Sequence, residues 1–95
     1  MGGLTELSKV FAMANAEDTT VRIHSFYDGP GLLAVVHANA ALGGPDAWVE
    51  WRYFDLEAQL YGDTIIPKNG LIAVPQGPGL GLEPSADVIR KYRLS

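Results

Sequence analysis

Hydrophobic residues gather in two long stretches of the chain that predict helices. Apolar residues three or four positions apart between Leu4 and Ala14 predict an amphipathic helix, for which Thr5 is the candidate N-cap. The stretch 32–42 is apolar on nearly every side and ends at a pair of glycines, which is typical of a helix C-terminus. A helix this apolar needs cover on more than one of its faces.

Short runs of β-branched and aromatic residues predict strands that follow these helices. One strand is expected over Thr20–Ile23, directly before His24, and the segment 28–31, Asp-Gly-Pro-Gly, then breaks the chain into the second helix. Another strand is expected over 47–54. The order helix, strand, helix, strand indicates an α/β fold. The stretch 20–31 is its centre, because reactive groups in α/β folds collect where strands open into loops.

The last part of the chain is irregular except at its end. Residues 55–67 carry isolated apolar anchors, which indicates a segment lying over another part of the protein. A turn is predicted at 68–70 and a short strand at 71–74. The run 75–82 holds so much glycine and proline that we expect an ordered, extended crossing, and a short helix with a serine N-cap is predicted over Pro84–Tyr92.

Composition narrows the class of protein. With 95 residues, 47% of them hydrophobic, the chain allows one domain with a modest core. The net charge of −4 comes from scattered carboxylates, which argues against nucleic-acid and anionic-membrane partners. The absence of cysteine excludes a disulfide scaffold and makes the reducing cytoplasm the expected compartment. No signal peptide or bilayer-spanning run is recognised in the sequence.

One combination of motifs extends along the whole chain: His24 at the end of a strand, Trp48-Val-Glu50 on the next strand, and the tail Pro-Gln-Gly-Pro-Gly-Leu-Gly at 75–81. In this combination the chain resembles the C-terminal portion of the mandelate racemase-like branch of the enolase superfamily, which includes acid-sugar dehydratases and racemases. The resemblance implies a C-terminal fragment of a modified TIM barrel. Residues 1–54 would supply its last two strands with their helices, and 55–95 would be the tail packing on the capping domain.

The resemblance also implies a reaction. Family members hold a substrate carboxylate on Mg²⁺ while a base removes the neighbouring proton. By this likeness His24 is the acid/base, a task that suits a histidine near neutral pH, and its orienting aspartate would precede Met1. Glu50 matches the glutamate that hydrogen-bonds a substrate carboxylate oxygen, and Asp28 is a further candidate for contacting substrate. The metal ligands match no residue of this chain, so Mg²⁺ and the sugar acid are expected only in the complete enzyme.

The residues alone leave other interpretations open. A histidine after an apolar strand is commonly a hydrogen-bonded structural group, and Glu50 also fits the exposed side of an alternating strand. Asp28 lies in a segment whose first role is turn formation, and His37 is interpreted as a packing residue of its helix. The aromatic residues of 48–54 are expected to pack. The glycine-rich tail lacks the lysine and hydroxyl residue of a phosphate loop, so it is interpreted as structural.

Three hypotheses about function follow. The first is a fragment of a Mg²⁺-dependent enzyme that removes the proton next to a carboxylate, inactive as an isolated chain. The second is one piece of a split enzyme that needs a separate N-terminal chain. The third is a non-catalytic small domain that covers its apolar helix by self-association. The sequence does not separate dehydration from racemisation, because the two reactions share their first step.

Overall fold

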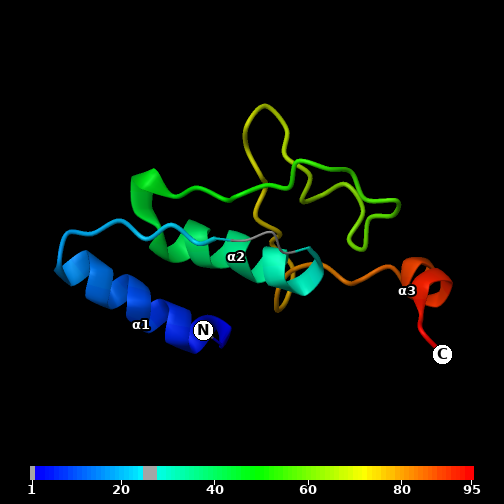
Figure 1. Cartoon of the computed structure of the whole chain (residues 1–95), viewed down its shortest axis with the longest axis horizontal. Helices are drawn as coiled ribbons and strands as arrows, with labels where there is room; N and C mark the ends of the chain where they lie inside the picture. Colours follow the sequence, from blue (N-terminus) through cyan, green and yellow to red (C-terminus); the bar gives the residue numbers. More distant parts are fainter. Residues whose placement is uncertain (1, 25–27) are drawn as a thin grey trace. The chain divides into compact units, whose positions relative to one another are not determined.

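The computed structural model describes residues 2–24 and 28–95, and within them the chain forms two compact units, Met1–Trp51 and Arg52–Ser95 (Figure 1). Met1 and residues 25–27, which belong to the predicted central stretch 20–31, lie outside the described residues. No helix in the described part of the chain has both the length and the apolar character needed to cross a bilayer.

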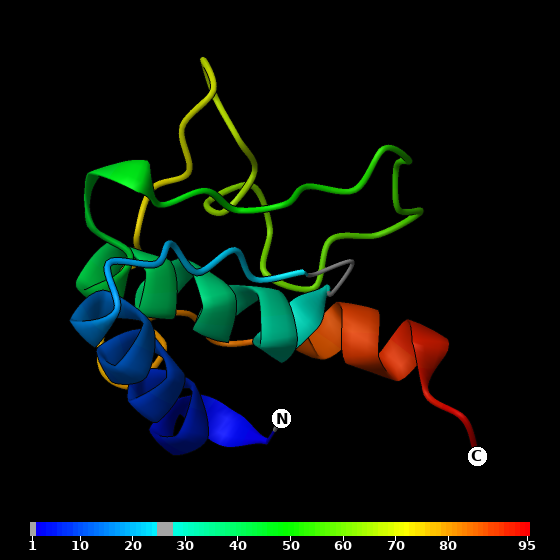
Figure 2. The same ribbon diagram turned by 60° about the vertical axis from the view of Figure 1, so that its left-hand side comes forward.

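Two helices lying side by side build the first unit (Figures 1 and 2). α1 spans Gly3–Ala16, and its Phe11 is buried, as the amphipathic pattern predicts. The N-cap is Gly2, so the prediction of Thr5 was wrong. Thr5 lies inside the first turns, where its carbonyl accepts a hydrogen bond from the Ser8 hydroxyl at 2.7 Å.

α2 spans Gly29–Leu42 and carries most of the buried apolar residues. It begins after Asp28 with a proline in its first turn, a position where the fixed φ of proline suits a helix start. A short 3-10 turn, η1, follows at Gly44–Asp46. Buried residues occur around most of the α2 circumference, which confirms that this helix is covered on more than one face: Leu32, Leu33, Val35, Val36, Ala38 and Asn39.

The strands predicted at Thr20–Ile23, 47–54 and 71–74 are not formed as strands. Among residues 2–24 and 28–95 the only β-type pairing is an isolated bridge between Lys68 and Leu71. The prediction failed because β-branched and aromatic residues show only that a segment would suit a pleated, half-buried surface. A strand forms only when a partner completes its ladder of hydrogen bonds. The predicted α/β fragment is thus a set of helices joined by irregular segments here.

The aromatic residues of the second predicted strand also differ from expectation. Trp48 is 69% exposed, so it does not pack as predicted, whereas Trp51 is half-buried and Tyr53, although 88% exposed, packs edge-to-face on Phe54 with ring centroids 5.4 Å apart. Trp48 follows a 3-10 turn on a segment that is not assigned as a strand, and one face of such a segment stays open to water.

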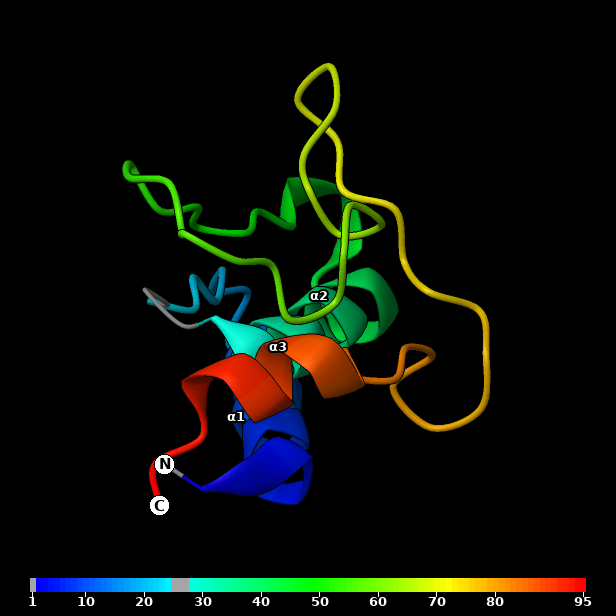
Figure 3. The same cartoon turned by 90° about the vertical axis from the view of Figure 1, so that its right-hand side faces the viewer.

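Turns and a short terminal helix organise the second unit (Figure 3). The predicted turn at 68–70 is confirmed, because the Lys68 and Leu71 backbones exchange hydrogen bonds of 2.8 and 3.0 Å. Asn69 and Gly70 both have positive φ, which is the geometry of a type I′ turn. The predicted terminal helix is α3, Ala86–Tyr92, and the Ser85 hydroxyl accepts from the Val88 amide at its start, which confirms the serine N-cap.

The glycine- and proline-rich tail is ordered and contains a tight turn. The Gly81 amide donates to the Pro78 carbonyl at 3.0 Å. Gly81 has φ +86°, and a Cβ at this position would lie 2.6 Å from the Pro75 Cβ. Only glycine satisfies both conditions without strain. The Ser85 amide then donates to the Leu60 carbonyl at 2.7 Å, joining the tail to the irregular segment 55–67.

Candidate functional site

Two of the predicted site residues, His24 and Glu50, lie together in the first unit. Nδ1 of His24 is 2.9 Å from Oε2 of Glu50, a hydrogen-bonding distance. The His24 side chain is 78% exposed and the Glu50 side chain 37% exposed. The pair therefore lies at the surface, with an imidazole that a small molecule in solution can reach.

This contact differs from one expectation. The family resemblance placed the carboxylate partner of His24 before Met1, outside the chain, whereas here Glu50 occupies that position on the imidazole. A carboxylate on Nδ1 fixes the ring orientation and directs Nε2 away from the pair. The 25 residues between the two side chains explain why spacing alone did not predict it.

A second pair of side chains lies beside the first. The Arg22 guanidinium carbon is 6.0 Å from the centre of the Trp48 ring, at the outer range of a cation–π contact. Residue 22 therefore pairs with 48, and residue 24 pairs with 50. The numbers increase in the same direction on both segments. The segments 20–24 and 46–50 thus lie in parallel register, although no ladder of backbone hydrogen bonds defines them as strands.

Exposure along 21–24 follows the same two-residue period. Val21 and Ile23 are partly buried, whereas Arg22 and His24 are exposed. This alternation is the side-chain pattern of a half-buried extended chain, with successive residues on opposite faces. The sequence pattern of the predicted strand therefore fixes which way His24 faces, even without a sheet.

Two polar side chains hold the segment that leads to Glu50. Nη1 of Arg22 donates to the backbone carbonyl of Asp46. Nδ2 of Asn39, on α2, donates to the backbone carbonyl of Trp48 at 3.0 Å. Asn39 is only 4% exposed, so its amide is held in place by the surrounding helix and core. The sequence analysis predicted a role for neither residue. Arg22 could have been found from its position two residues before His24, because such residues share a face of an extended segment.

An apolar groove of about 630 Å³ reaches His24 from the interior of the first unit. Its wall comes from α1, the segment 21–24 and α2. His24 thus lies at the edge of a mostly apolar groove and also contacts Glu50.

The third predicted site residue, Asp28, is the N-cap residue of α2. Its side chain makes no capping hydrogen bond there. Its part in substrate binding stays a prediction. His37 lies partly buried on α2, in keeping with its interpretation as a packing residue.

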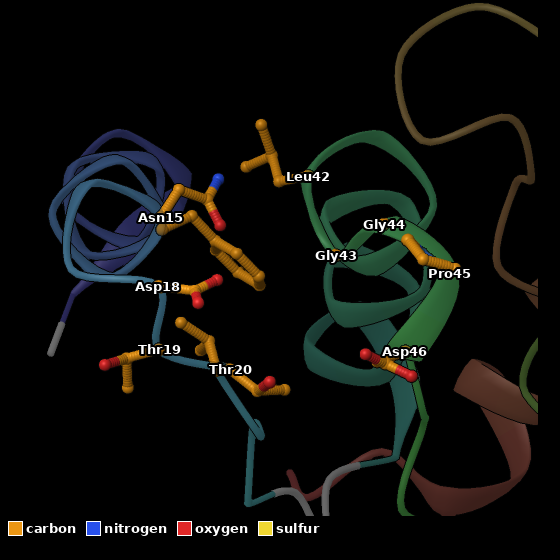
Figure 4. Close-up of a pocket in the computed structure, with 11 residues that line it drawn as sticks. Asn15, Asp18, Thr19, Thr20, Leu42, Gly43, Gly44, Pro45 and Asp46 are labelled. Carbon is orange, nitrogen blue, oxygen red and sulfur yellow. The ribbon is translucent and has the colours of Figure 1, made fainter.

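A smaller pocket of about 280 Å³ lies at the other end of the segment, between the C-terminal ends of α1 and α2 (Figure 4). Asp18 and Asp46 face the space from opposite sides, and Asn15, Thr20 and Pro45 also line it. None of the predicted site residues takes part in this pocket.

The family resemblance implies Mg²⁺, and the described residues do not form a site for it. Within 2–24 and 28–95 no three histidine or carboxylate side chains come together in a way that could hold a metal ion. The His24–Glu50 pair offers a single carboxylate, and its imidazole nitrogen is not the oxygen ligand that Mg²⁺ prefers.

Similarity to known proteins covers nearly the whole chain. A family described as "Enolase C-terminal domain-like" matches residues 1–88. Arabinonate dehydratase of Saccharolobus solfataricus is 32% identical over 94 residues, which is 97% of this chain and 25% of that protein. D-gluconate dehydratase of Thermoproteus tenax is 31% identical over 101 aligned residues, 98% of this chain and 19% of that protein. No solved structure matches the chain significantly.

Proposed function

The chain belongs to the enolase C-terminal domain-like family, and from this premise we propose that it is the acid/base-bearing portion of a sugar-acid dehydratase. Because the chain spans 25% and 19% of the two relatives' lengths, the proposed activity is that of a complete enzyme and not of this chain alone. In that enzyme residues 1–54 would occupy the last two strand–helix units of the barrel, and residues 55–95 would form the tail toward the capping domain.

The observation that carries the proposal is the contact between His24 and Glu50. Each residue is a candidate for its own motif, and the two are 26 positions apart in the sequence. Their Nδ1 and Oε2 atoms nevertheless lie 2.9 Å apart. The parallel register of 20–24 with 46–50 supports their assignment to neighbouring barrel strands, because adjacent strands of such a barrel are parallel.

The proposed chemistry begins with loss of the proton next to the substrate carboxylate. We assign proton transfer to Nε2 of His24, since Nδ1 faces Glu50. The neighbouring carbon then loses its hydroxyl group, which leaves as water once a proton is delivered to it, and the resulting enol becomes a 2-keto-3-deoxy acid. Glu50 is assigned, as the neutral acid, the donation of a hydrogen bond to a substrate carboxylate oxygen as charge builds there, while its Oε2 stays on Nδ1 of His24. Any Mg²⁺ would have to be held by residues beyond those described, so no step is derived through it.

The test with the isolated chain is direct. Incubation with Mg²⁺ and a panel of sugar acids, arabinonate and gluconate among them, is expected to give no 2-keto-3-deoxy acid. Formation of that product at a rate comparable with a complete dehydratase would contradict the proposal that the rest of the enzyme is needed.

A chimera tests the assignment of roles. The matched segment of the Saccharolobus arabinonate dehydratase is replaced by this chain, and turnover of arabinonate is measured. His24→Asn is expected to lower kcat by about 10³-fold and Glu50→Gln by about 10²-fold, the sizes typical of lost acid/base and oxyanion contacts. His37→Asn is the matched control and should leave kcat unchanged. A folded, active chimera that is indifferent to His24→Asn would refute the role of His24.

The split-enzyme hypothesis is supported by the lengths of the relatives, because this chain matches only 25% and 19% of them. Supplying the remaining part of the Saccharolobus protein as a separate polypeptide would give turnover on mixing if the two parts assemble. We retain the cytoplasm as the proposed compartment, based on the cysteine-free composition.

A further inference from the structure

Arg22 and Asn39 are polar residues that the proposed chemistry does not use, yet both act on the segment that carries Glu50. Arg22 donates to the carbonyl of Asp46 and lies over the Trp48 ring. Asn39 donates to the carbonyl of Trp48 at 3.0 Å. Arg22 and Asn39 thus donate to two backbone carbonyls, those of Asp46 and Trp48, which are two residues apart.

We propose that Arg22 and Asn39 are positioning residues that set Glu50 against His24. Glu50 comes two residues after Trp48, and in an extended chain such residues share a face. Fixing Trp48 therefore fixes the side from which Glu50 projects. Arg22 holds the same stretch against the segment that carries His24. It precedes His24 by two residues and lies on the same exposed face.

The physical reason is the missing ladder. In a sheet, backbone hydrogen bonds hold neighbouring strands in register, and a slip of one residue would turn Glu50 to the opposite face. Here no strand is formed within the described residues, so side-chain contacts to the 46–48 backbone provide the register. Asn39 does so from a buried place on α2, and Arg22 from the exposed side.

The pairing itself is independent of the proposed function, and only its use in catalysis rests on that function. The first test is therefore structural and uses the full 95-residue chain. Proton–proton cross-peaks in the NMR spectrum between the His24 ring and the Glu50 side chain report their contact. Circular dichroism reports whether α1 and α2 remain formed.

Arg22→Met and Asn39→Leu are each expected to reduce the equilibrium constant for pairing, the ratio of paired to unpaired molecules, about fivefold, the factor that corresponds to about 1 kcal/mol of lost hydrogen bonding at 1.4 kcal/mol per tenfold. Arg22→Lys keeps a cation near Trp48 but loses the guanidinium fork, so its cross-peaks should be intermediate. Arg90→Met and Asn15→Leu are matched controls in exposed places and should leave the cross-peaks at full strength.

Unchanged cross-peaks in both Arg22→Met and Asn39→Leu would overturn the proposal. Should Asn39→Leu lose helical signal because Asn39 is buried, the exposed Arg22 decides alone through its methionine and lysine variants. In the chimera, Arg22→Met is expected to lower kcat more than it changes KM. An inactive chimera whose parent chain shows the Arg22-dependent cross-peaks would refute the proposed function and leave the positioning role standing.

Discussion

The two units of this chain are stabilised in different ways. In the first unit, Met1–Trp51, α1 and α2 bury Phe11 and a group of apolar side chains on α2. In the second unit, Arg52–Ser95, the buried apolar side chains among the described residues are Ile65 and Pro75, and glycines with positive φ turn the chain at several points. The first unit thus depends on apolar burial, and the second on backbone geometry.

This difference shows where a site is best supported. The His24–Glu50 pair lies in the unit with the buried core, and one of its neighbouring contacts, the Asn39 hydrogen bond to the Trp48 carbonyl, comes from α2. The second unit holds its own parts together through single contacts, such as the Ser85 amide on the Leu60 carbonyl and the Lys91–Glu57 ion pair at 3.7 Å. A side chain is placed more accurately by a packed helix than by such separate contacts.

The largest expected effect comes from the core of the first unit. Leu33 is fully buried on α2, so Leu33→Ala should lower the free energy of unfolding by about 3 kcal/mol, through lost burial and the cavity left behind. Urea unfolding followed by tryptophan fluorescence measures this, because Trp48 and Trp51 both lie in the first unit.

The matched control is Leu71→Ala in the second unit. Leu71 is 75% exposed, and its replacement should change stability by less than about 0.5 kcal/mol. If the two leucine variants cost the same, the distinction between a burial-dependent and a turn-dependent unit is wrong.

A smaller effect is expected from the tail of the second unit. Gly81→Ala adds a Cβ 2.6 Å from the Pro75 Cβ and forces a side chain into φ +86°, so we expect a cost of about 2–3 kcal/mol confined to this unit. Hydrogen exchange at the Gly81 amide, which donates to Pro78, measures the local opening.

Gly62→Ala separates the two causes of that cost. Gly62 also has positive φ, at +66°, but a Cβ there would meet nothing within 4 Å, so about 1 kcal/mol of backbone strain is expected. Equal costs at Gly62 and Gly81 would show that close packing of the tail contributes nothing.

The smallest effect concerns the start of α3. Ser85→Ala removes the hydroxyl that accepts from the Val88 amide and should reduce the stability of this short helix by about 1 kcal/mol. Backbone chemical shifts of 86–92 measure the helical population. Ser8→Ala is the control, since Ser8 lies within α1 and bonds the Thr5 carbonyl; a loss of α1 equal to that of α3 would argue against a capping role.

The sequence by itself determined the helices and the special turns. Helical spacing of apolar residues located α1 and α3, and the apolar run 32–42 located all of α2 except its first turn. The Asn69–Gly70 pair located the turn at which Lys68 and Leu71 meet. These features are local: a helix satisfies its hydrogen bonds within its own segment, and a left-handed turn depends on which residues tolerate positive φ. Nearby residues are enough to encode them.

The tertiary structure decided the strands and the site. Residues 20–23 and 47–54 have strand composition, yet a strand needs a partner that no local pattern supplies, and none forms within the described residues. The sequence identified His24 and Glu50 as candidates. Their contact, and the Arg22 and Asn39 bonds beside it, arise only when α2 brings distant segments together, because such contacts depend on packing across the unit.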